Sequence, residues 1–177
     1  MKRHLDRLII ASLLVLGALV SWPSAQQFND VTARRLCVGA ALSSCTTVGS
    51  VKVTLTALQV KALHTTPITL VSAPGSGKVV IVDDIVFGAT FVSAAYTGSN
   101  NLEFRYTDGS GTKVTADIAA ATLNFSTGTK YGSVTGVTTE LTALANAAVV
   151  VAVPVANPAA GDSPINFSVF YRVVTLP

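Results

Sequence analysis

The chain has 177 residues, of which 12% are charged and 50% hydrophobic, and its formal net charge is +3. Disordered chains combine low hydrophobicity with high charge, so this composition excludes disorder and predicts one domain with a buried core. Three of the 12 basic residues lie in the first 25 positions, and the remaining nine nearly balance the acidic residues, which argues against a nucleic-acid-binding surface. A surface with so few charged residues predicts that the protein functions as part of an assembly.

Residues 1–25 have the form of a secretory signal peptide. Three basic residues precede or border a 13-residue apolar stretch, Leu8–Val20. This stretch is shorter than the ~20 residues that a membrane span needs. Ala25 is the residue expected before a cleavage site, although Pro23 fits the cleavage pattern poorly. Three interpretations stay open: a cleaved signal, a retained anchor that would be the protein's membrane contact, and an extension from a misplaced start.

Residues 26–50 lack clean periodicity and are expected to be a linker or an extended arm. They contain both cysteines of the chain, Cys37 and Cys45. The pair is a disulfide candidate if the chain is exported, since oxidising compartments allow such bonds. The alternative is two small apolar residues in a loosely ordered leader. A C-x7-C spacing with no nearby histidine is not a zinc site.

A short helix is predicted over 57–64, because T-A-L-Q at 56–59 fits the capping box. Its core-facing side chains are expected to be Leu58, Ala62 and Leu63.

Two strands, 68–72 and 79–91, should follow, joined by a turn at 73–77. Gly88 within the second strand is expected to mark a bulge or a sharp bend. The segment SAPGSGK before that strand imitates a phosphate-binding loop but lacks its first glycine and its final hydroxyl. Since Lys78 leads into a strand rather than a helix, we interpret it as a solvated lysine beside a turn.

A hairpin is predicted next, with a half-buried strand at 101–107, a turn at 108–111 and a return at 112–117. Its core-facing side chains should be Leu102, Phe104 and Tyr106.

Residues 118–123 can form either a helical turn or more strand. Residues 126–140, rich in Gly and Thr, are expected to be a surface excursion. The strand 148–155 carries Pro154 near its end, which predicts an edge strand, because proline cannot donate a ladder hydrogen bond.

The last strand, 165–174, alternates apolar and polar residues, but Phe170 and Val174 lie on its polar side. They should be either covered by a loop or available to a neighbouring subunit. Pro154, Phe170 and Val174 are therefore the candidate assembly-surface residues.

Seven or eight strands with at most two short helices predict an all-β fold, an antiparallel β-sandwich of the jelly-roll-like type. The expected division is a hydrophobic leader at 1–25, an arm at 26–50 and the sandwich at 51–177.

Reactive chemistry is sparse. Asp83 and Asp84 are adjacent, so in a regular strand they would point to opposite faces. A calcium site would need further oxygen ligands to converge, from Asp108, Asp117 or Asp162.

His64 is expected at a helix end, and no G-x-S-x-G motif is present. We therefore predict no enzyme activity, no catalytic or metal-binding residues, and no cofactor. A sugar-binding platform of tyrosines is a weaker interpretation than core or rim positions for the four tyrosines, Tyr96, Tyr106, Tyr131 and Tyr171.

Three segments carry a resemblance to a known family: LTALQVKALHTTPITLVSAPGSGKVVIVDD at 55–84, AAYTGSNNLEFRY at 94–106 and FSVFYRVV at 167–174. Together they resemble small phage and prophage virion structural proteins, over about residues 51–175. The resemblance implies a virion location, a non-enzymatic role as head decoration, minor capsid or fibre-like protein, and partners among other virion proteins.

Self-association is also expected, as a closed ring, a trimer, that covers sheet edges and apolar faces. The alternative function is an exported bacterial surface or periplasmic module that binds a glycan or a protein.

Overall fold

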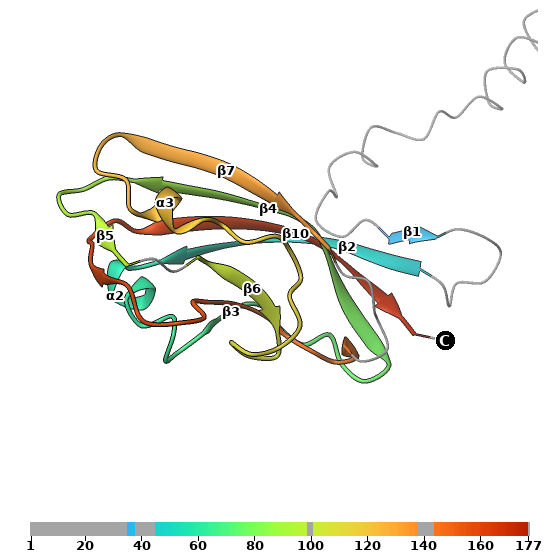
Figure 1. Ribbon diagram of the computed structural model, residues 1–177. Coiled ribbons are helices and arrows are strands. Elements are labelled where there is room, and N and C mark those ends of the chain that lie inside the picture. Colours follow the sequence, from blue (N-terminus) through green and yellow to red (C-terminus); the bar gives the residue numbers. More distant parts are fainter. Residues whose placement is uncertain (1–34, 38–44, 99–100, 138–143, 177) are drawn as a thin grey trace, which may run out of the picture. The chain divides into compact units, whose positions relative to one another are not determined.

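The computed structural model describes residues 35–37, 45–98, 101–137 and 144–176 (Figure 1). All of them belong to one of the two units into which the chain divides, the unit that starts at Ala33. The predicted leader and most of the predicted arm lie outside the described residues. Within the described part, no helix is long and apolar enough to cross a membrane.

The described residues form ten strands and two one-turn helices, and all the strand pairings are antiparallel. This confirms the predicted all-β antiparallel class. The strands are β1 Arg35–Cys37, β2 Cys45–Leu55, β3 Ile68–Val71, β4 Lys78–Thr90, β5 Tyr96–Thr97, β6 Glu103–Tyr106, β7 Thr129–Thr135, β8 Val149–Ala152, β9 Ala159–Ala160 and β10 Ile165–Thr175; the helices are α2 Ala57–Val60 and α3 Ala120–Leu123.

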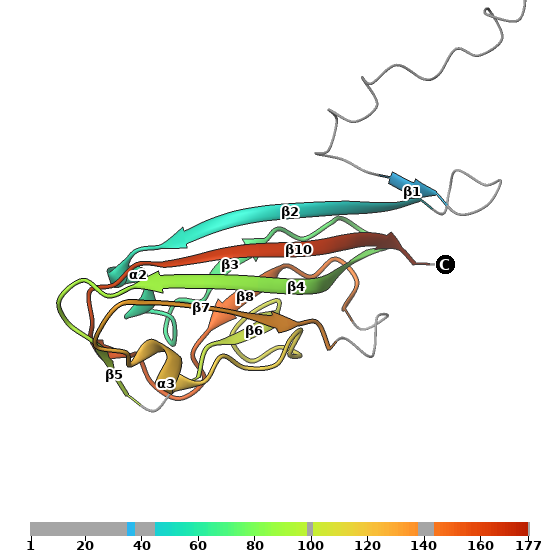
Figure 2. The same ribbon diagram turned by 90° about the horizontal axis from the view of Figure 1, so that it is seen from above.

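Two sheets make the two main layers. The larger has the order β1-β2-β10-β4-β7 and the smaller the order β3-β8-β6, while β5 and β9 pair separately. Figure 2 shows β2, β10, β4 and β7 in one layer, with β3, β8 and β6 beneath them. The specific jelly-roll form of sandwich stays a prediction.

The core lies between the two layers. Phe167 on β10 packs edge-to-face on Phe104 on β6, with ring centroids 5.6 Å apart. Such a pair contributes about 0.5–1.5 kcal/mol beyond its buried area. Ile85 on β4 and Val151 on β8 are fully buried in the same cluster. Leu102, Phe104 and Tyr106 are buried, which confirms their predicted core-facing positions. Glu103, expected on the opposite side, is buried as well, so the strand is not half-buried as predicted.

The capping box is confirmed. The Thr56 hydroxyl accepts from the Gln59 backbone N–H, and the Gln59 side chain accepts from the Thr56 N–H. The helix itself ends at Val60, earlier than predicted, and turns follow. The buried side of this segment carries Val60 and Leu63, which are fully buried, whereas Leu58 is 76% exposed and Ala62 is partly exposed. The prediction for Leu58 was therefore wrong.

Gly88 does not mark a bulge, because β4 pairs regularly with β10 and β7 on both sides of it. A Cβ atom at Gly88 would lie 2.9 Å from the ring of Tyr131, its partner on β7. The glycine therefore makes room for an aromatic ring on the neighbouring strand.

The predicted surface excursion at 126–140 is instead largely strand β7, which pairs with β4. Glycine at position 132 is required by close packing, since a Cβ there would lie 2.6 Å from Phe87 Cζ. Composition misled the prediction, because residues that usually signal a loop here serve packing against β4.

The edge predicted near Pro154 is also wrong. β8 lies between β3 and β6, and all four of its residues, Val149–Ala152, are buried. Pro154 follows the end of β8 and is exposed. A proline beyond a strand removes no ladder hydrogen bond, so it gives no information about the edge.

The larger sheet reaches further toward the N-terminus than expected. β2 begins at Cys45, six residues before the predicted start of the sandwich at position 51. Residues 118–123 were expected to form either a helical turn or more strand, and the chain forms the helical turn α3 there. The return of the predicted hairpin at 112–117 makes isolated bridges at Lys113 and Thr115 rather than a strand.

Candidate assembly surface

The larger sheet has one side turned away from the core, which we call the outer face. Alternation along each strand selects its members, since their neighbours on β10, such as Phe167 and Val169, are buried in the core. The outer face consists of Val48, Ser50, Lys52 and Thr54 on β2, Asn166, Ser168, Phe170 and Arg172 on β10, Asp83, Asp84 and Val86 on β4, and Tyr131, Ser133 and Thr135 on β7.

Four exposed apolar side chains cross this face in a line. Val48, Phe170, Val86 and Tyr131 are 40%, 44%, 39% and 80% exposed. They are half of the eight large apolar side chains that are exposed among the described residues. We call these four the apolar diagonal.

Strand register explains the line. Phe170 is opposite Ser50 on β2 and Asp84 on β4, so Val48 and Val86 are its diagonal neighbours. Val86 is opposite Ser133 on β7, so Tyr131 is its diagonal neighbour. Diagonal neighbours on adjacent strands are about 7–8 Å apart, which aromatic side chains can span. The apolar diagonal thus runs unbroken across four strands.

A bulge lies beside the apolar diagonal. Along β10, Phe170 pairs with Asp84 but Tyr171 pairs with Val82, so Asp83 is the extra residue on β4. Asp83 forms an ion pair with Arg172, whereas Asp84 lies opposite Phe170. The prediction that the two aspartates point to opposite faces was therefore wrong, because it assumed a regular strand.

Asp84 carries an unusual atom. Its Oδ1 is buried and has no hydrogen-bond partner among the described groups. Leaving a buried polar atom unpaired costs free energy, about 1–3 kcal/mol or more for a charged group. A donor from outside the described residues would remove that cost.

The structure separates the three candidate residues that the sequence predicted. Phe170 lies on the outer face and is exposed. Val174 is only partly exposed and packs against the core cluster. Pro154 follows the central strand of the smaller sheet. Sequence reasoning missed Val48, Val86 and Tyr131, because the run Val79–Phe91 is apolar on both faces and β7 was expected to be a loop.

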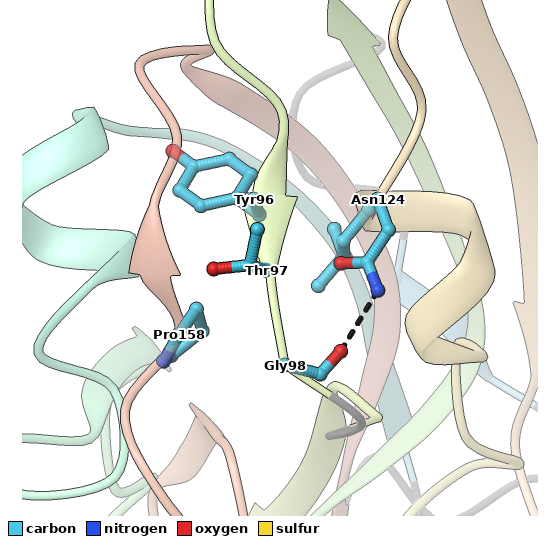
Figure 3. A pocket seen from close by; sticks show the side chains of 6 residues that line it. Tyr96, Thr97, Gly98, Asn124 and Pro158 are labelled. Atoms are coloured by element: carbon cyan, nitrogen blue, oxygen red, sulfur yellow. Dashed lines mark hydrogen bonds between the residues drawn. The ribbon is translucent and has the colours of Figure 1, made fainter.

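A small pocket lies between β5 and the end of α3 (Figure 3). Its polar groups already have partners: the Asn124 amide donates to the Gly98 carbonyl at 2.8 Å, and the Tyr96 hydroxyl donates to the Ser163 carbonyl at 2.6 Å. Burial, with a smaller effect from the charge of Asp162, raises the pKa of Tyr96 to about 12. The phenol is therefore neutral at physiological pH and is unsuited to act as a base.

A second hollow, of about 300 Å³, opens between β3 and the inner side of β2 and β10. Its lining is largely apolar and carries no charged side chain: Val51, Leu70, Val71, Ser72, Pro74, Tyr171 and Val173. It lacks the convergent polar groups that orient a small ligand.

The remaining candidates have ordinary structural positions. His64 Nδ1 lies 3.0 Å from the Val153 carbonyl oxygen. Lys78 is exposed and starts strand β4. Tyr96 and Tyr106 are buried while Tyr131 is exposed, so the four tyrosines do not share a platform.

The aspartates considered for calcium do not converge. Each bonds instead to near neighbours: Asp108 to Ser110, Asp117 to Lys113, and Asp162 to Ser93. Within the described ranges, no group of three or more His, Cys, Asp or Glu side chains could hold a metal ion.

Comparisons with known proteins give little help. No protein-family model matches the chain, and no curated protein matches it. Among solved structures, one chain described as part of the "Cyanophage Pam1 capsid asymmetric unit" matches with a TM-score of 0.42 and 17% identity, covering 88% of this chain and 100% of that chain. A similarity this slight does not establish a function.

Proposed function

We propose that the protein is a non-enzymatic structural protein of a phage particle, as head decoration, minor capsid or fibre-like component. It would act by docking its outer face on neighbouring subunits. The observation that carries this proposal is the apolar diagonal, from Val48 to Tyr131, on an ordered sheet face. The resemblance to virion structural proteins points the same way.

The composition of the outer face suits an interface. The apolar diagonal is flanked by small polar residues such as Ser50, Ser168 and Ser133. Interfaces commonly have an apolar centre and a polar rim. A second sheet can pack on such a face at about 10 Å, and a specific interface needs about 1,000 Å² or more of buried surface.

Asp84 gives the docking a polar requirement. Its unpaired Oδ1 lies next to Phe170 in the register of the sheet. Because this atom is buried, a partner that covers Phe170 and brings an N–H or a cationic group would satisfy it only if the Asp84 carboxylate turned toward that partner. Such a partner would be favoured over one that is merely apolar.

Self-association into a closed ring, a trimer, is part of the proposal, together with contacts to other virion proteins. β7 is the last strand of the larger sheet in the described part of the chain. Edge strands need to be covered or blocked in assembled proteins. The location proposed is the virion, with no catalytic residue, cofactor or nucleic acid assigned.

An exported surface or periplasmic module is the second candidate. The observation in its favour is that Cys37 and Cys45 are directly opposed in the β1–β2 pairing. Disulfides persist in exported proteins and are rare in the cytoplasm. A signal peptide at 1–25 would be required.

Density-gradient fractionation of infected or induced cells tests these alternatives. Each fraction would be digested and searched by mass spectrometry for this chain and its N-terminal peptide. The virion proposal expects the chain to co-sediment with particles. Recovery only from the periplasm or medium, with an N-terminus near Gln26, would reject it and support the exported module.

A further inference from the structure

We infer that Cys37 and Cys45 form an intramolecular disulfide that joins β1 to the start of β2. The inference does not depend on the outer face, because it concerns a covalent modification at the N-terminal end of the larger sheet. It rests on backbone register, in which Cys37 is the direct partner of Cys45.

The register satisfies the distance that a disulfide needs. Directly opposed residues in an antiparallel pair have Cα atoms about 4.5 or 5.5 Å apart, depending on the hydrogen-bonding type of the pair. Cα separations in disulfides span about 4.4–6.8 Å. Both types of pair therefore fall within the range.

The place of the pair gives the bond a structural role. β10 pairs with β2 from Thr47 to Leu55, so Cys45 and Thr46 extend beyond it. Their strand partner among the described residues is β1, which contributes three register pairs. A two-stranded ladder this short is marginally stable in water. A covalent link at its end would hold β1 on β2.

The chemistry is a two-electron oxidation. The two thiols lose two protons and two electrons and form one S–S bond. Oxidised glutathione can serve as the oxidant: thiolate attack gives a mixed disulfide, and the second cysteine then releases reduced glutathione. The sum is one protein disulfide and two molecules of reduced glutathione.

A redox titration with peptide mapping tests the inference. The folded chain is equilibrated in glutathione buffers of known ratio, quenched with acid, alkylated and digested with trypsin. Cleavage after Arg35 and Lys52 gives the peptide Leu36–Lys52, which contains both cysteines and no internal cleavage site. The expected product is this peptide without alkyl groups and two hydrogen masses lighter. A doubly alkylated peptide under oxidising ratios would overturn the inference.

A register-shifted variant is the matched control. Cys45→Ser combined with Thr46→Cys keeps two cysteines but places the new one opposite Leu36 rather than Cys37. We expect its equilibrium constant for oxidation to be at least about tenfold smaller, which corresponds to about 30 mV for a two-electron couple. When the wild type and the variant are both unfolded in guanidinium, their equilibrium constants for oxidation should become equal. Equal constants in the folded proteins would show that nearness in sequence, not the register, makes the bond.

The outcome is separate from that of the fractionation. An oxidised pair in a chain that co-sediments with particles would support both proposals. A reduced pair in particles would reject the disulfide alone.

Discussion

Arg172 on β10 donates from its Nε to Asp83 Oδ1 on β4 at 2.9 Å, across the bulge where the register of these two strands shifts. The pair borders Phe170 and Asp84, so it helps to shape the outer face. Both side chains are well exposed, at 44% and 40%. Exposed ion pairs contribute little to stability, because water and salt screen them.

Arg172→Ala should therefore lower the free energy of unfolding by less than about 1 kcal/mol. Urea denaturation of the wild type and the variant at low and at high salt would measure this loss. The difference in unfolding free energy between the two proteins should become smaller as salt is added. A loss well above this limit would show that the pair does more than border the bulge.

Glu103→Ala should cost more. Glu103 is 5% exposed and is contacted by Arg105 and by Lys113, the latter at 2.8 Å. Removing one partner of a buried pair leaves the other charges uncompensated. Because Lys113 is itself 41% exposed, we expect about 2 kcal/mol rather than the full value for a buried pair. Urea denaturation of this variant and of Arg172→Ala would compare their losses of unfolding free energy. Equal losses would contradict a larger stabilising role for the buried carboxylate of Glu103.

Tyr96 should make stability depend on pH in the alkaline range. Its folded pKa is raised to about 12 from an ordinary value of 10.0. Below pH 10 both states keep the proton and the contribution is complete. Above pH 10 the unfolded state ionises first, so this stability is lost as the pH rises through about 12. Two pKa units correspond to about 2–3 kcal/mol.

Tyr96→Phe is the control for that dependence. It should cost about 1 kcal/mol at neutral pH, since the bond to the Ser163 carbonyl is lost. As the pH rises from 10 to 12 the wild type should lose more unfolding free energy than this advantage, so its difference from the variant should shrink and then change sign, as measured by chemical denaturation. A constant difference would refute the role assigned to Tyr96.

Gly161→Ala should destabilise the protein by at least about 2 kcal/mol. Gly161 has a φ of +76°, and a Cβ there would lie 2.1 Å from Tyr96 Cδ1. Gly128, also at positive φ (+71°) but with nothing within 4 Å of a Cβ, is the matched control. Gly128→Ala should cost only its backbone strain, about 1 kcal/mol. Equal shifts in thermal melting would mean that Tyr96 adjusts freely.

Phe170→Asp should abolish assembly while leaving the monomer folded. Phe170 is 44% exposed at the centre of the outer face, so a charge there removes apolar contact area and adds a desolvation cost to docking. Incorporation into particles and the far-ultraviolet circular dichroism of the monomer are the two measurements.

Val155→Asp provides the control, because Val155 is 72% exposed and lies away from the larger sheet, in the segment after β8. It should assemble normally. Unchanged incorporation of Phe170→Asp, or equal loss in both variants, would remove the outer face as the docking surface.

Several features of this protein follow from local sequence. The capping box of Thr56 and Gln59 and the core-facing positions of Leu102, Phe104 and Tyr106 were predictable. Each depends on residues within a few positions of one another, through a hydrogen-bonded turn or the two-residue period of a strand. The all-β class follows from the sum of such signals.

Only the tertiary structure decided which strands meet and which faces stay uncovered. β8 is a central strand although Pro154 suggested an edge, and β7 is the last strand of the larger sheet in the described residues although the glycines near Tyr131 suggested a loop. The bulge at Asp83 sets the register of β4 against β10, and with it the line from Val48 to Tyr131. These features depend on pairings between residues as far apart in the sequence as Thr47 and Val173, which are 126 positions apart, and no local period encodes such pairings. The sequence alone therefore determined the kind of strand, and long-range pairing decided where the apolar surface lies.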